Sequence, residues 1–342
     1  MWSICRFMVV LAFLIFGVGC QRPVRTEVRA YITNHDSDDV SVIRVSDDTV
    51  IATVGVGGQP YGVAAAPDGR RVYVANTGSK TLSVIDTAEN RVVTTVLLKK
   101  PPIGVTVSPD NRHVYVAEML PFREQEGYLE VIRTADNKVE SSLQLPTLPE
   151  GIVPSANGKR LYVSHRGGLL SALDVESLTV LQTANLTQYT SGRTRMLQGI
   201  VPSADGKHLY VVNNWPFVLS IIREEDLHEL AQVKFDNGPF AIALLPQNNK
   251  AYVSIEGNLR LSDQVAVVDT SQNTVVSTIT VGLMPMGIDV TPDAKKIYVA
   301  SRKANLVFVI DPSQDQVVGV ISVGKEPVAF GKFICAVPLS SS

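Results

Sequence analysis

Four polar residues occupy positions where a repeated unit of this sequence otherwise carries amides or apolar side chains. Glu118 and His165 stand where three other copies of the unit have asparagine. Glu150 and Gln198 stand where other copies have residues such as Tyr61. Two carboxylates and an imidazole suit a divalent cation, so Glu118, Glu150 and His165 are candidate metal ligands. The alternative is that the charged members form solvated salt bridges at a rim.

Three further residues belong to the same candidate ligand-binding site. Arg193 and Arg195 lie in a long insertion beside these residues, and guanidinium groups bind anionic groups well. Trp215 precedes Pro216 and Phe217, so it is either an exposed aromatic contact or a cap on its unit. A polar sector in an otherwise apolar rim is typical of a small-ligand site.

The stretch 35–39, His-Asp-Ser-Asp-Asp, offers carboxylates to calcium but lacks the regular alternation of known calcium loops. A solvated acidic turn is the other interpretation. The sequence contains no Cys-x-x-Cys-His, no Gly-x-Ser-x-Gly, no phosphate-binding loop and no paired-histidine zinc helix. We therefore expect a non-catalytic protein without a cofactor, a divalent metal being the one exception left open.

The elements that must position these residues come from a repeat. An aromatic residue followed by β-branched residues recurs in seven copies, which begin at Tyr31, Tyr73, Tyr115, Tyr162, Tyr210, Tyr252 and Tyr298. Each copy continues with two more apolar runs, a loop and a short segment that opens with Gly or Ala. Strands rich in Val, Ile, Thr and Tyr, without helical periodicity, predict an all-β fold, a seven-bladed β-propeller with four-stranded blades.

The two ends of the repeat predict how the ring closes. The chain enters with the second strand of a unit, Val28 to Thr33, and ends with a lone first strand, Ala329 to Ile334. A blade cannot bury both of its faces alone, so the units must pack side by side and close. We therefore expect the C-terminal strand to pair with the N-terminal blade.

Length variation is confined to two kinds of loop. Each segment-opening Gly or Ala is followed by a Tyr after 11 residues, as from Gly62 to Tyr73. Insertions occur instead between the second and third strands, after Tyr115 and Tyr252, and between two blades, after Asp174. In an up-and-down blade both kinds of loop emerge at the same end of the ring, which marks that end as the binding face.

On these residues the chain resembles the YVTN-repeat β-propeller family. The unit is clearest at Val72-Tyr73-Val74-Ala75-Asn76, and the match spans Val28 to Ile334. Relatives of such propellers include surface-layer proteins and periplasmic binding proteins, and haem nitrite reductases, nitrous oxide reductase and amine dehydrogenase subunits carry similar folds. The resemblance implies a fold and not a function.

The N-terminus resembles a lipoprotein signal peptide. Arg6 precedes an apolar run, 7–16, that is short for a membrane span, and small residues precede Cys20. In such signals the cysteine is diacylated and becomes the new N-terminus, although Gly17 stands where leucine is usual. Gln21, in place of aspartate, then implies the outer membrane. Ordinary signal cleavage nearby is the alternative.

Composition bears on partners and on disulfides. The formal net charge is −2 and no basic run exceeds a pair of lysines, so no nucleic-acid partner is expected. Cys5 leaves with the signal and Cys20 is acylated in this interpretation, so Cys335 has no cysteine to pair with.

The sequence thus divides into a signal peptide (1–19), a lipidated tether (20–27), the propeller (28–335) and a C-terminal tail (336–342). We expect an exported lipoprotein, anchored in the membrane by its lipid on the periplasmic side of the outer membrane or at the cell surface. Its decorated face would bind a protein, glycan or small ligand. The alternatives are a metal-dependent hydrolase of the lactonase kind and a redox-associated propeller subunit, using Glu118, Glu150 and His165.

Overall fold

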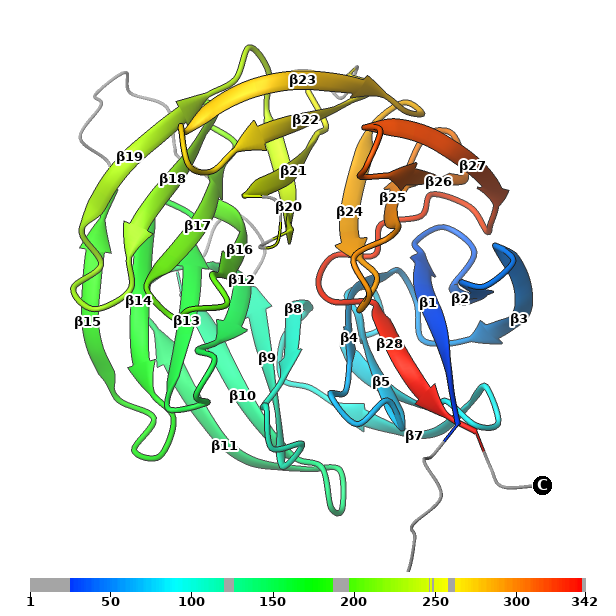
Figure 1. Ribbon diagram of the computed structural model, residues 1–342. Coiled ribbons are helices and arrows are strands. Elements are labelled where there is room, and N and C mark those ends of the chain that lie inside the picture. Colours follow the sequence, from blue (N-terminus) through cyan, green and yellow to red (C-terminus); the bar gives the residue numbers. More distant parts are fainter. Residues whose placement is uncertain are drawn as a thin grey trace, which may run out of the picture.

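The computed structural model describes residues 25–119, 126–186, 197–245, 247, 249–257 and 262–339. These residues form seven sheets of four antiparallel strands, arranged as blades around a ring (Figure 1). The predicted seven-bladed β-propeller is therefore confirmed. Within the same residues, no helix has the length and apolar character that crossing a membrane would need.

The four strands of a blade run from the centre of the ring to its outside. The first, innermost strands are β4 (Pro60–Ala65), β8 (Pro102–Val107), β12 (Pro149–Pro154), β16 (Leu197–Pro202), β20 (Pro239–Leu245), β24 (Pro285–Val290) and β28 (Ile334–Pro338). The second strands are β1 (Thr26–Asn34), β5 (Arg71–Asn76), β9 (His113–Met119), β13 (Arg160–His165), β17 (His208–Asn213), β21 (Lys250–Ile255) and β25 (Ile297–Ser301).

The third and fourth strands complete each blade towards the solvent. The third strands are β2 (Asp39–Arg44), β6 (Thr81–Asp86), β10 (Gly127–Arg133), β14 (Leu169–Asp174), β18 (Val218–Arg223), β22 (Gln264–Asp269) and β26 (Leu306–Asp311). The outer strands are β3 (Thr49–Gly55), β7 (Arg91–Leu97), β11 (Lys138–Leu145), β15 (Val180–Asn185), β19 (Glu229–Lys234), β23 (Thr274–Thr280) and β27 (Gln316–Ser322). Blade 1 contains β28, β1, β2 and β3, and blade 7 contains β24 to β27.

Burial explains why the repeat is so apolar. The middle strands lie between two neighbouring blades, so both of their faces are covered, as in β5 and β6. Outer strands such as β7 alternate between exposed and partly buried residues because they border solvent. Apolar burial contributes roughly 25 cal/mol per Å², so side-by-side packing of the blades is the main stabilising term.

A repeated glycine lets the innermost strands approach one another. At Gly62, a Cβ atom would lie 2.1 Å from the carbonyl oxygen of Ile103 in the next blade. At Gly104, it would lie 2.3 Å from the carbonyl oxygen of Glu150. Real Cβ atoms do not approach backbone so closely, so glycine permits the narrow centre of the ring.

The repeated tyrosine joins neighbouring blades at their edges. In blade 7, the Tyr298 hydroxyl donates to Asp48, in the turn before the outer strand of blade 1, and Lys296 Nζ lies 2.8 Å from the same carboxylate. The same contact recurs elsewhere: Lys250 and Tyr252 bind Asp315 of the next blade. A basic residue two positions before each Tyr is present in all seven copies: Arg29, Arg71, His113, Arg160, His208, Lys250 and Lys296.

Ring closure by the C-terminal strand is confirmed, but its position differs from the prediction. β28 pairs antiparallel with β1 from Thr26↔Pro338 to Ala30↔Ile334 (Figure 1). The predicted strand 329–334 instead lies largely along β4 of blade 2, where Val63 N donates to Phe330 O over 2.9 Å. Gly331, with φ of +123°, makes the bend between the segment that lies along β4 and the strand β28.

The predicted boundaries of the ring shift accordingly. Thr26 and Glu27, placed in the tether, belong to β1, and 336–338, placed in the C-terminal tail, belong to β28. The segment that contains this bend is two residues longer than the corresponding part of the other first strands. Sequence spacing alone therefore placed the closing strand too early in the chain.

Candidate functional site

The upper face is defined here as the end of the ring where each second strand ends and the third begins. Glu118 and His165 lie there, at the ends of β9 and β13, and Glu150 and Gln198 lie at the corresponding ends of β12 and β16. The four residues therefore share one face in neighbouring blades, as predicted. None of them faces solvent, since each is at most 4% exposed. Arg193, Arg195 and Cys20 lie outside the described residues.

Glu118 faces a second acid across its hairpin. Burial, together with the Glu130 carboxylate, raises the pKa of Glu118 to about 8. Glu118 Oε2 accepts a hydrogen bond of 3.2 Å from the backbone N–H of Lys100. The pKa of Glu130 is also raised, mainly by burial, although Lys99 opposes that rise. Two buried carboxyls that face each other cannot both be ionised cheaply.

His165 has two structural partners. Its Nε2 lies 3.0 Å from Ser171 Oγ, and its Nδ1 lies 3.4 Å from the Thr147 carbonyl oxygen. Burial lowers the pKa of His165 to about 4, against a small opposing effect of that carbonyl. The imidazole is therefore neutral at physiological pH and serves the packing of its own blade.

Glu150 forms an ion pair with Arg166, which follows β13 directly. Burial raises the pKa of the Glu150 carboxyl, and the Arg166 guanidinium opposes that rise. Gln198, in the next blade, is buried and its side-chain oxygen has no hydrogen-bond partner in the described structure. Of the two acids that the sequence predicted for the site, Glu118 and Glu150, only Glu150 is in direct contact with a cation among the described residues.

The three candidate metal ligands do not assemble into one group. Among the described residues, the one set of three or more His, Cys, Asp or Glu ligand atoms within 4.8 Å of one another is His35, Asp36 and Glu326. Glu118, Glu150 and His165 have separate partners instead, namely Glu130, Arg166 and Ser171. The interpretation of these three residues as a metal centre therefore gains no support from the geometry.

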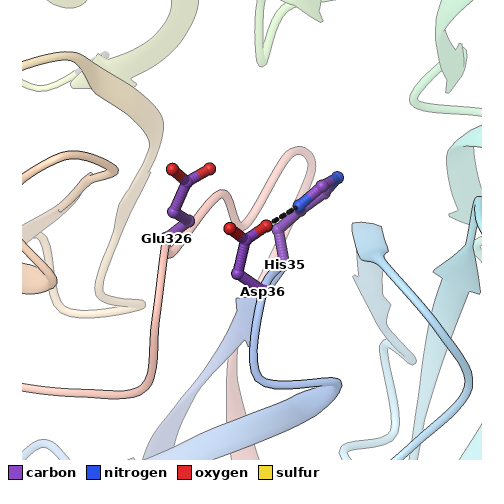
Figure 2. A group of neighbouring side chains, drawn as sticks. All are labelled: His35, Asp36 and Glu326. Carbon is purple, nitrogen blue, oxygen red and sulfur yellow. Dashed lines mark hydrogen bonds and ion pairs between the residues drawn. The ribbon is translucent and has the colours of Figure 1, made fainter.

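His35, Asp36 and Glu326 lie on two adjacent connections of the upper face (Figure 2). Asp36 Oδ1 is 2.5 Å from His35 Nδ1, and this hydrogen bond lowers the pKa of Asp36. Burial opposes ionisation of Glu326, but Lys303 and Arg302 outweigh it and lower its pKa. With two cations already beside Glu326, the group is an ion-pair cluster.

A charged ring around the channel mouth was missed by the sequence reasoning. At the repeat position one after that of Glu118 and His165, the seven copies have His35, Thr77, Met119, Arg166, Asn214, Glu256 and Arg302. Four of these seven are ionisable side chains, and they come from different blades. A comparison of this one position across the seven repeats would have found these four ionisable residues in the sequence.

Tyr61 lies at the centre of this ring, which we call the upper mouth. Its pKa is raised by burial and then by the charges of Glu150 and Glu256, while Arg302 and Arg166 oppose the rise. Those four residues belong to blades 4, 6 and 7, and the ring of Tyr61, from blade 2, packs against Phe330, which lines the central cavity. Arg302 Nη2 is 2.7 Å from Glu326, which fixes its orientation.

At the upper mouth, three aromatic rings from different blades pack against one another. Phe330 lies 5.4 Å from Phe240 and 6.0 Å from Tyr61 between ring centroids. Below Phe330 a cavity of about 500 Å³, lined by apolar residues of the innermost strands, runs to the lower face. Asp289 in its wall accepts hydrogen bonds of 2.9 Å from Phe333 N and Ile334 N of the closing segment.

Trp215 lies in the turn between β17 and β18 on the upper face. Its ring packs edge-on against Phe217, with centroids 4.9 Å apart, and both residues are half-buried. Both earlier interpretations, aromatic contact and cap, remain compatible with this position.

Comparison with known proteins shows the fold alone. No family model matches the chain. No curated protein matches it either. Among solved structures, Kuenenia stuttgartiensis hydrazine synthase is similar with a TM-score of 0.70 and 21% identity, over 83% of this chain and 92% of that one.

Two further structures have the same architecture. A functionally unknown protein from Desulfotomaculum acetoxidans DSM 771 has a TM-score of 0.71 and 16% identity, covering 92% of this chain and all of its own. Dihydro-heme d1 dehydrogenase NirN in complex with DHE has a TM-score of 0.66 and 15% identity, covering 91% of this chain and 75% of its own. At such identities these proteins support the propeller fold and no shared activity.

Proposed function

We propose that this protein is a YVTN-repeat propeller of the cell envelope, a non-catalytic module that binds an anionic ligand at its upper mouth. The observation that carries the proposal is that Arg166, held by Glu150, and Arg302, held by Glu326, both act on the phenol of Tyr61, which packs against Phe330 beside the central cavity. Tyr61, Arg166 and Arg302 come from blades 2, 4 and 7, so they meet only in the closed ring.

The ion pairs of the mouth support binding because they fix the donors in advance. Arg302 is held by Glu326, and Arg166 by Glu150. A guanidinium that is already oriented loses less conformational freedom when a carboxylate or phosphate docks against it. The nearby glutamates disfavour ligands without a matching charge pattern, which adds selectivity.

The test uses inorganic phosphate and a set of short dicarboxylates as probes, with isothermal titration calorimetry. Arg302→Gln and Tyr61→Phe should each weaken binding roughly tenfold, since a hydrogen bond to a charged group contributes about 1.5–3 kcal/mol. Arg44→Gln removes the same charge from an exposed turn, where Arg44 pairs with Asp47, and serves as the matched control. Equal binding by Arg302→Gln and the wild type would reject the upper mouth as the site.

We further propose that Cys20 carries a lipid anchor. The small residues before Cys20 support this. The first strand, β1, begins at Thr26, next to Pro338, at the end of the ring opposite the upper face. A tether leaving from there would turn the lower face to the membrane and leave the upper mouth accessible. Cys20→Ser should move the protein from the membrane fraction to the soluble fraction, whereas Cys335→Ser should not.

A further inference from the structure

Glu118 and Glu130 occupy a repeated cross-strand position that holds neutral partners in other blades. In blades 1 and 2 the last residue of the second strand is Asn, and its amide donates to a Ser of the third strand over 2.9 Å. In blade 4 the pair is His165 and Ser171, at 3.0 Å. In blade 3, two acids replace this donor–acceptor pair.

The acid pair is sealed from water. Glu118 is 0% exposed and Glu130 is 1% exposed. Within the part of the chain that the structure describes, Glu118 Oε1 and both carboxylate oxygens of Glu130 have no hydrogen-bond partner. An ionised carboxylate left in this way carries a large desolvation penalty.

The surrounding elements supply too little positive charge for two carboxylates. Lys99 Nζ lies 3.8 Å from Glu130 Oε1, but this lysine side chain is 59% exposed. The innermost strand β8 contains no ionisable residue, and β11 places Ser142 opposite Glu130. On β12, Glu150 is already paired with Arg166. Among the described residues, one solvated cation therefore faces two buried acids.

We propose that Glu118 and Glu130 share one proton in the folded protein, and that losing it makes the upper end of blade 3 a pH-responsive element. The proton sits between the two carboxyls, so one donates an O–H to the other, in place of the Asn–Ser hydrogen bond. Once the proton leaves, two like charges face each other across β9 and β10, and these strands separate more easily.

The sign of the effect follows from proton linkage. The pKa of Glu118 is raised from 4.5 to about 8, so between these values the folded state keeps a proton that the unfolded state has lost. Stability from this pair is therefore full at low pH and is lost as the pH rises towards 8. One extra bound proton corresponds to about a tenfold change in the unfolding equilibrium constant per pH unit. The two carboxyls titrate as a pair, so the midpoint belongs to both.

The experiment compares denaturant unfolding of the full chain from pH 5.5 to pH 9. Glu118→Asn with Glu130→Ser restores the pair of blades 1 and 2 and should remove this part of the pH dependence. Relative to that variant, the unfolding constant of the wild type should rise about tenfold per pH unit up to pH 8. Glu118→Gln keeps the side-chain shape and should also flatten the profile, which covers the case in which the double variant folds poorly.

Glu126→Gln provides the matched control, because Glu126 is an exposed acid just before β10. Its profile should follow the wild type. Infrared spectra should show a protonated carboxyl band at pH 7 that is absent from Glu118→Gln. Identical pH profiles for the wild type and Glu118→Gln would overturn the proposal, as would the absence of that band from the wild type.

Discussion

Asp48 joins the last blade to the first, so its removal should loosen the closed ring at one definable place. Its carboxylate accepts from the Tyr298 hydroxyl and lies 2.8 Å from Lys296 Nζ, both in blade 7. Asp48→Asn is the suitable change, because Asp48 has a φ of +56°, which Asn also tolerates. The Asn side chain keeps one oxygen that can accept a hydrogen bond, and an NH₂ group, which can only donate, takes the place of the other oxygen.

The expected loss of folding stability follows from that one missing hydrogen-bond acceptor. Hydrogen bonds to charged groups contribute about 1.5–3 kcal/mol, and a pair that is partly exposed lies at or below the lower end. The side chains of Lys296 and Asp48 are 28% and 26% exposed. We therefore expect a loss of about 1–2 kcal/mol, which lowers the melting temperature by roughly 1.5–3 °C in a domain of this size.

Asp47→Asn is a control in the same turn. Asp47 pairs with Arg44, which belongs to the same blade. Thermal unfolding by circular dichroism should therefore distinguish the two neighbouring aspartates. In a double-mutant cycle, Tyr298→Phe should cost less in the Asp48→Asn background than in the wild type. Equal melting temperatures for Asp47→Asn and Asp48→Asn would refute the role of this contact in closing the ring.

Three further experiments test the closing segment, two by substitution and one by thiol labelling. Asp289→Ala leaves the N–H groups of Phe333 and Ile334 without their acceptor and should destabilise the fold by about 2–5 kcal/mol in denaturant titrations; a loss within error would contradict the contact. Gly331→Ala should lower the melting temperature, because φ is +123° and the new Cβ would lie 2.4 Å from Val63 O, whereas Gly55→Ala meets nothing within 4 Å and should not. Cys335 is 7% exposed and burial raises its pKa to about 12, so it should react with a thiol reagent only after denaturation; rapid labelling of the native protein would show that β28 detaches.

Much of the architecture could be predicted from the sequence, because a blade is a local unit. The spacing from Gly62 to Tyr73 fixes a hairpin, and its repetition predicts the seven blades that the structure contains. The same spacing placed Glu118 and His165 at one end of the ring. Turn lengths and alternation of apolar residues act over a few neighbouring positions, so they can be deduced from neighbouring residues alone.

The tertiary structure decided what those residues do. Glu118 was expected at a rim, yet the pleat of β9 turns its side chain towards Glu130 on the next strand, where it is buried. The upper mouth around Tyr61 gathers residues from blades that the sequence separates widely. The sequence by itself determined the number and order of the strands, because these depend on local periodicity. Only closure of the ring decided which polar groups are buried, paired or open to a ligand, because desolvation and charge pairing depend on neighbours far away in the chain.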